Sequence, residues 1–328
     1  MATRATAGWK RFLRVVGVAA ALLMLATCYA TQPVLERTRS PDATAFDAAR
    51  LERHVRMLSR TLAPRDASDP AQLDKAADYI RAEFKRAGGR IADQPFAALN
   101  ATYRNVIASF GPEDGERIVV GAHYDACDPL PGADDNASGV AGLIELAYAL
   151  GKNAPQARID LVAYTLEEPP FFDTPYMGSA VHAKTLKDAQ VSVRLMISLE
   201  MIGYFSDAPG SQRFPSAAMA ALYPTTGNFI AVVGDMTSGL LVRGIKRRML
   251  AASDLPVYSM NAPASVMGVD LSDHRSYWAQ GYPAVMITDT AFFRNAAYHT
   301  AEDTAERLDY ARMAKVMSGV YAVISAEH

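Results

Sequence analysis

The segment GADDNASGVAG (residues 132–142) decides the fold class that this sequence predicts. An apolar strand pattern ends shortly before it, and a helix of small residues is expected from about 137 to 150. Two adjacent aspartates lie at the turn between them, where they repel each other unless positive charge is close by. The turn therefore predicts a unit of strand, loop and helix that holds a cation. The simpler alternative for Asp135 is that its carboxylate faces the positive end of the helix dipole.

The alternation of strand and helix extends in both directions from this turn. We expect strands near residues 103–110, 117–124, 158–168, 193–201, 229–234 and 283–289. We expect helices near residues 45–60, 70–87, 137–150, 178–187, 238–252, 272–279 and 307–326. This pattern predicts an α/β fold, specifically a three-layer α/β/α sandwich in which helices cover both faces of a mostly parallel, mixed sheet.

Residues 1–30 differ from the rest of the chain. Four basic residues precede an apolar run at 15–26, which is the pattern of an export signal. The run is short for a membrane span but allows an uncleaved anchor over 9–30, and 25–28 resembles a lipoprotein cleavage box that ends at Cys28. We expect an exported protein, periplasmic or extracellular, with cleavage, lipidation and membrane anchoring left open.

The remaining residues, 31–328, are expected to form one domain. Half of the whole chain is hydrophobic and its formal net charge is only -2, which is typical of a globular protein. There is no basic cluster outside the N-terminal segment, so a nucleic acid is not an expected partner. A stretch rich in Pro, Gly and Ser predicts an inserted loop or lid near 204–228, and Cys127 is expected to be a small buried residue.

Polar side chains gather where several of the predicted strands end. They are His123, Asp125, Asp134, Asp135, Glu167, Glu168, Glu200 and His299. The carboxyl ends of parallel strands meet at one edge of a sheet, so these groups are expected to lie close together. A closed core cannot hold so many unpaired carboxylates, because each desolvated charge costs several kcal/mol. A divalent cation would balance them.

The residue types favour zinc and hydrolysis. Imidazole and carboxylate ligands suit zinc, and a hydrolytic site leaves one position open for water. Two ions about 3.5–4 Å apart that share a bridging carboxylate recur in two-metal enzymes, and one of the paired aspartates could supply such a bridge. Glu167 and Glu168 point in different directions from a strand end, so one can bind metal while the other acts as a general base.

Five motifs in order resemble the co-catalytic zinc aminopeptidase family, which includes bacterial leucyl aminopeptidase and, more distantly, glutamate carboxypeptidase and glutaminyl cyclase. They are GAHYD (121–125), PGADDNASG (131–139), the glutamate pair 167–168, SDH (272–274) and YHTAEDT (298–304). The resemblance extends from about residue 103 to the C-terminus. It implies a zinc-exopeptidase-like fold for this region.

The resemblance also implies a role for each site residue. The implied ligands of two zinc ions are His123, Asp134, Glu168, Glu200 and His299. Asp134 would bridge the ions, Glu167 would be the general base, and Asp125 would orient His123. In the best-known members an aspartate matches Glu200, so the longer side chain here implies a second ion that is weaker or exchangeable.

These roles predict an aminopeptidase that hydrolyses the N-terminal residue of peptides through a zinc-activated water. Aromatic residues at 169–179, Phe292, Phe293 and the 204–228 segment favour substrates with apolar N-terminal residues. One alternative is a glutaminyl cyclase with a single zinc, and another is a non-catalytic binding ectodomain. The complete ligand set and base argue against both.

Other polar residues have simpler structural explanations. His54, His182 and His328 are expected to be ordinary surface groups, and Glu145 a solvated helix residue. Ser272 or Asp273 suits a helix N-cap, and a site-lining role for Asp273 or His274 is the less favoured alternative.

Overall fold

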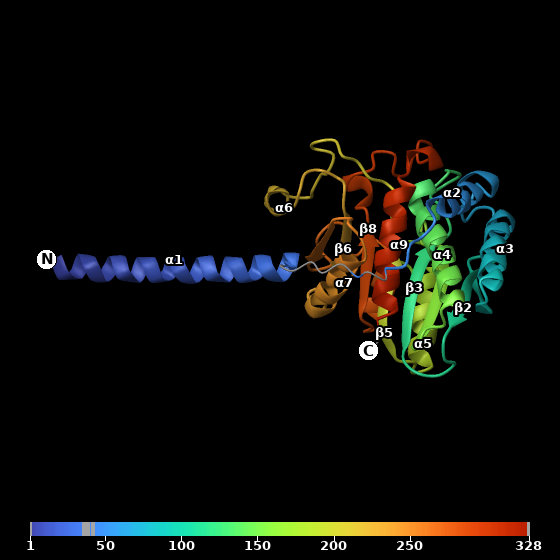
Figure 1. Cartoon of the computed structure of the whole chain (residues 1–328), viewed down its shortest axis with the longest axis horizontal. Coiled ribbons are helices and arrows are strands. Elements are labelled where there is room, and N and C mark those ends of the chain that lie inside the picture. Colours follow the sequence, from blue (N-terminus) through green and yellow to red (C-terminus); the bar gives the residue numbers. More distant parts are fainter. Residues whose placement is uncertain (1, 35–39, 41–42, 327–328) are drawn as a thin grey trace.

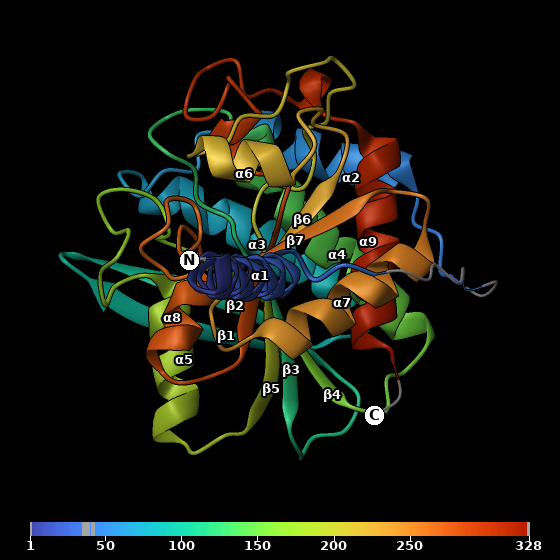
Figure 2. The same cartoon turned by 90° about the vertical axis from the view of Figure 1, so that its left-hand side faces the viewer.

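The computed structural model describes residues 2–34, 40 and 43–326, and its strands form one sheet (Figures 1 and 2). The strands are β1 (Arg90–Ala98), β2 (Ala101–Phe110), β3 (Arg117–His123), β4 (Arg158–Tyr164), β5 (Val193–Leu199), β6 (Ile230–Gly234), β7 (Val257–Asn261) and β8 (Ala284–Thr288). Their spatial order is β1-β2-β4-β3-β5-β8-β6-β7.

Four central strands run in the same direction. β4, β3, β5 and β8 pair in parallel, while β2 is antiparallel to β4 and β6 is antiparallel to β8. β1 pairs antiparallel with β2, and β7 pairs parallel with β6. The parallel block therefore brings four carboxyl ends to one edge of the sheet, which is where functional groups gather in such folds.

Helices cover both faces of the sheet, so the predicted α/β fold is confirmed. One face carries α2 (Ala48–Arg56), α3 (Pro70–Arg86), α4 (Gly139–Lys152), α7 (Gly239–Ala252) and α9 (Tyr310–Ile324), whose apolar residues form the larger core cluster. The other face carries α5 (Gly178–Asp188) and α8 (His274–Ala279) over a smaller cluster. A short helix, α6 (Ala217–Leu222), lies in the 204–228 segment.

The burial of each strand explains whether it could be predicted from the sequence. Six of the seven residues in β3, in β4 and in β5 are buried, as expected for parallel strands covered on both faces. β1 and β7, which we did not predict, are the two edge strands of the sheet. β1 is mostly exposed and contains Pro95, which an edge strand tolerates because it need not donate to a neighbour on its free side.

The N-terminal helix α1 (Ala2–Thr31) projects from the body as a rod (Figure 1). Its segment Phe12–Thr31 is 20 residues long, with a mean hydropathy of 2.0, and its most apolar part is not buried. This is long and apolar enough to cross a membrane, and a signal sequence near an N-terminus has the same properties.

Candidate metal centre

The carboxyl ends of the parallel strands bring the predicted site residues together. His123 is the last residue of β3, Glu167 and Glu168 follow β4, and Glu200 follows β5 directly. His299 comes from the long loop after β8. All except His299 are buried.

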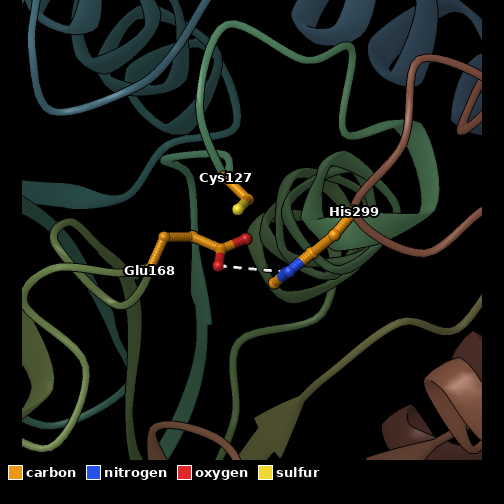
Figure 3. Close-up of side chains that lie close together, drawn as sticks. All are labelled: Cys127, Glu168 and His299. Carbon is orange, nitrogen blue, oxygen red and sulfur yellow. Dashed lines mark ion pairs between the residues drawn. The ribbon is translucent and has the colours of Figure 1, made fainter.

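Asp135 lies between the two histidines. Its Oδ1 is 3.3 Å from His123 Nε2 and its Oδ2 is 3.1 Å from His299 Nε2. Each imidazole also faces one glutamate: His123 Nε2 is 3.4 Å from Glu200 Oε2, and His299 Nε2 is 3.2 Å from Glu168 Oε2 (Figure 3). Two imidazole and carboxylate pairs therefore share one central carboxylate.

Asp134, the residue that the resemblance placed at the bridge, does not join this cluster. Its Oδ1 accepts a hydrogen bond from the backbone N–H of Gly203 at 3.0 Å, and its Oδ2 accepts one from Asn295 Nδ2 at 3.0 Å. Asp135 has an extended backbone (φ -103°, ψ 94°), so neighbouring side chains leave this turn in different directions. The structure therefore places Asp135, and not Asp134, between the two histidines.

At the turn before the two aspartates, backbone atoms lie too close together for a side chain. Gly132 has φ +56°, and a Cβ there would lie 2.3 Å from the carbonyl oxygen of Asp135. The carboxylate of Asp303 accepts hydrogen bonds from the backbone N–H groups of Asp134 and Asp135 at 3.0–3.1 Å. These contacts fix the backbone that presents Asp135.

Arg65 is a further buried residue behind the site, and our sequence analysis did not identify it. Its guanidinium donates to the carbonyl oxygens of Leu58, Tyr124, Pro131 and Gly132 at 2.6–3.0 Å. It therefore ties the segment after His123 to the turn before Asp135. An isolated arginine whose partners are all backbone groups leaves no sequence motif.

Two side chains contact the candidate ligands from behind. Asp125 Oδ1 is 3.6 Å from His123 Nδ1, and its Oδ2 accepts a hydrogen bond from the backbone N–H of Glu168 at 3.1 Å. Ser272 Oγ donates to Glu200 Oε2 at 2.7 Å. Neither Ser272 nor Asp273 caps α8 with its side chain, so the N-cap explanation for this segment does not hold.

Within the cluster of candidate ligands, three buried atoms lack hydrogen-bond partners. They are His123 Nε2, His299 Nε2 and Glu168 Oε1. Potential ligand atoms of His123, Asp135 and Glu200 all lie within 4.8 Å of one another. Buried polar atoms without partners are costly, and imidazole nitrogens and carboxylate oxygens are zinc ligands, so these residues fit a divalent metal ion.

The charges in the cluster also favour a cation. Burial raises the pKa of Glu168 to about 8, and the nearby charge of Asp135 adds to this rise. Burial alone would lower the pKa of His299, but hydrogen bonds to Asp135 and Glu168 raise it to about 10. Without a metal the cluster would hold extra protons to limit its negative charge, and divalent cations could replace them.

Several residues that we expected at the surface are buried. His54 faces Glu145, which is fully buried and also pairs with Arg50, so Glu145 is not a solvated residue. His182 is buried, with Nδ1 2.6 Å from the hydroxyl of Tyr277. In each case the partner lies far away in the chain, which is why local sequence could not reveal the burial. His328 lies outside the described residues.

Cys127 lies beside the site and is half-buried rather than fully buried. Its sulfur and potential ligand atoms of Glu168 and His299 lie within 4.8 Å of one another (Figure 3). His274 is buried, with Nε2 2.7 Å from the carbonyl oxygen of Val269, and is not among the metal-type groups found in the described residues.

An apolar pocket adjoins Glu200. Its walls include Phe214, Met219, Tyr223, Met286, Phe292, Phe293 and Tyr298. The first three belong to the 204–228 segment, which therefore shapes the pocket. No residue of 169–179 lines it, and Phe171 instead packs edge-on against Tyr103 in the core.

Comparisons with known proteins identify the family of the chain. The profile of Peptidase family M28 matches residues 105–324. The chain is 49% identical over 282 residues to the uncharacterized protein YfbL of Escherichia coli, covering 84% of this chain and 86% of that protein. It is 28% identical to a probable leucine aminopeptidase of Trichophyton verrucosum, covering 66% of this chain but only 55% of the relative, about half its length.

Solved structures show the same fold. LapB from Legionella pneumophila superposes with a TM-score of 0.66 at 22% identity, covering 85% of this chain and 71% of that one. A Bacteroides thetaiotaomicron glutaminyl cyclase gives 0.67 at 18% identity, covering 88% and 100%. The family profile spans most of the sheet and every residue of the candidate centre. The chain belongs to Peptidase family M28.

Proposed function

We propose that this protein is a zinc-dependent aminopeptidase with two ions per chain. The observation that carries the proposal is the position of Asp135 between two imidazole and carboxylate pairs. His123 and Glu200 would complete one ion site, and His299 and Glu168 the other. When bound, zinc ions lower the pKa of a water and polarise the carbonyl of the scissile bond.

Glu167 is the proposed general base. It is buried at the site, and its Oε2 lies 3.9 Å from His123 Nε2, further than the three carboxylates assigned as ligands lie from their imidazoles. From there it would take a proton from water and return it to the leaving amine nitrogen. Burial raises the pKa of Glu167 well above its usual range in the metal-free protein, and bound zinc ions would lower it so that Glu167 can accept a proton.

The surroundings support attack at a free N-terminus with an apolar side chain. The α-amino group of a bound peptide would lie against the carboxylates and ions of the centre, which would distinguish a free N-terminus from a blocked one. The pocket beside Glu200 would take the first side chain, and its aromatic and methionine walls favour Leu, Met or Phe. The 204–228 segment would act as a wall or lid over that side chain.

A panel of aminoacyl p-nitroanilides tests the proposal. We expect turnover of Leu and Phe substrates to exceed that of Glu and Lys substrates, and no turnover of N-acetyl-leucine p-nitroanilide. A lead for charged residues would contradict the assignment of the pocket. Cleavage of the acetylated substrate would contradict the requirement for a free amine.

A peptide that begins with glutamine distinguishes the aminopeptidase from the leading alternative, a glutaminyl cyclase. An aminopeptidase releases glutamine, whereas a cyclase releases ammonia and leaves the chain length unchanged. Two histidines that share one carboxylate favour the peptidase, since a single-zinc centre needs only one such pair. Bound metal without turnover of any peptide would instead indicate a binding protein.

A further inference from the structure

The C-terminal end of α1 is held by the domain through three side chains. Asn261 Nδ2 donates to the carbonyl oxygen of Tyr29 at 3.1 Å. Lys246 Nζ and Ser259 Oγ both donate to the carbonyl oxygen of Thr31, at 2.8 Å and 2.9 Å. We call Lys246, Ser259 and Asn261 the helix socket.

The socket matches the chemistry of a helix end. The last carbonyl groups of a helix have no partner within it, and they carry partial negative charge that a cation stabilises. All three socket residues are buried, including Lys246, which is 6% exposed. The carbonyl oxygen of Thr31 accepts from this buried lysine, so the docked helix end and the domain stabilise each other.

We propose that α1 is retained as a membrane anchor and that the socket fixes its exit from the bilayer. Cleavage or lipidation at Cys28 would leave only a few residues of α1, from Cys28 to Thr31. A helical segment that short does not form alone, because helix nucleation is unfavourable. The socket is therefore built for a chain that keeps the residues before Cys28.

The rest of α1 has the properties of a bilayer-spanning helix. Phe12, Leu22, Leu23 and Leu25 are each more than half exposed in the described structure. The stretch from Phe12 to Cys28, before the socket, would span about 25 Å as a helix, close to the thickness of the hydrocarbon core. A lipid bilayer would cover this exposed apolar surface of α1.

The two ends of the helix indicate its orientation. Trp9 and Tyr29 lie near opposite ends, where aromatic residues favour the membrane interfaces. All four basic residues of α1 lie in its N-terminal half, against two in the ten residues that follow it, which favours a cytoplasmic N-terminus and a domain on the other side. Figure 1 shows α1 leaving the body near β6 and α7, away from the loops that carry the site at the carboxyl ends of the strands.

Membrane extraction and intact mass test whether the anchor is retained. The full chain with a C-terminal tag is expressed in a Gram-negative host, together with a Cys28→Ser variant. We expect both proteins to remain in the membrane pellet after carbonate washing, with masses that include residues 2–31. A chain that begins after residue 26, an added lipid on Cys28, or release of the Cys28→Ser variant would overturn the proposal.

Photocrosslinking tests the socket separately. A Cβ at Gly239 would lie 2.8 Å from the Tyr29 ring, and the Tyr29 hydroxyl donates to the carbonyl oxygen of Met236. The photoreactive residue p-benzoylphenylalanine in place of Tyr29 should therefore crosslink to residues 236–239, and the same residue in place of Leu22 should not. Equal crosslinking from both positions would overturn the socket. Neither readout uses peptidase activity, so failure here leaves the proposed function standing.

Discussion

Two buried clusters in this molecule combine carboxylates with imidazoles, and they differ in how the negative charge is balanced. In the helical layer, Glu145 is fully buried, with Arg50 Nη2 2.6 Å and His54 Nε2 3.3 Å from its oxygens. The chain itself supplies the positive charge for this glutamate. Such a pair ties helices together and needs no ligand.

At the strand ends the balance is different. Four carboxylates, those of Asp135, Glu167, Glu168 and Glu200, share two imidazoles. The guanidinium of Arg65 lies behind them, but it donates to backbone carbonyls instead. The comparison teaches that buried acids alone do not mark a functional site, whereas buried acids in excess of the cations around them do.

The largest expected effect comes from replacing the proposed base. Glu167→Gln should lower kcat by about 10²–10⁴-fold, the usual contribution of general base catalysis. The metal content should stay at the wild-type value, because Glu167 is not one of the proposed ligands. Steady-state kinetics and elemental analysis of the same sample measure both. Wild-type activity in this variant would contradict the assignment of Glu167 as the general base.

The matched change in the other cluster should act on stability alone. Glu145→Gln breaks an ion pair between the buried Glu145 and the partly exposed Arg50, which should lower the free energy of unfolding by about 2 kcal/mol. Urea unfolding measures this loss, and kinetics on the folded variant should show unchanged kcat. A loss of bound metal in Glu145→Gln would mean that the two clusters are not independent.

A buried neutral histidine away from the centre should make the protein sensitive to acid. Burial lowers the pKa of His182 to about 4, from 6.5 in an unfolded chain. The unfolded state therefore binds the proton first, and stability is lost as pH falls from 6.5 toward 4. Between pH 7 and pH 5 this single group should cost about 2 kcal/mol.

Urea unfolding at both pH values, for the wild type and for His182→Gln, measures that cost. The variant should lose about 2 kcal/mol less than the wild type over this interval. Equal losses would show that His182 does not remain neutral in the fold.

The smallest effect concerns the residue that contacts Glu200. Ser272→Ala removes the hydroxyl that donates to Glu200 Oε2 at 2.7 Å. Loss of such a supporting hydrogen bond typically weakens metal affinity by about 10-fold. Zinc titration should show this loss for one ion only, and an equal loss at both ions would contradict the separate assignment of Glu200.

The strands that are buried on both faces were predictable because their apolar runs are nearly continuous, as in Ile118–Ala122. Polar residues at the ends of these runs were predictable for the same reason. The edge strands β1 and β7 were missed because they lack such a continuous apolar run. Arg50 as the partner of Glu145 and Tyr277 as the partner of His182 were missed because each lies 95 residues away in the chain.

The paired aspartates mark the limit of the sequence reasoning most clearly. The motif located the turn, but composition and resemblance could not show which carboxylate faces the histidines. That choice depends on the backbone angles of Asp135 and on the N–H of Gly203 and the amide of Asn295, which hold Asp134 elsewhere.

Zinc stoichiometry in a matched pair of isosteric variants tests the central claim most directly. The wild type should bind two zinc ions per chain after removal of loosely bound metal. Asp135→Asn should lose at least one of them, and Asp134→Asn should keep both. A wild type that binds no zinc, or a loss in Asp134→Asn but not in Asp135→Asn, would contradict the account.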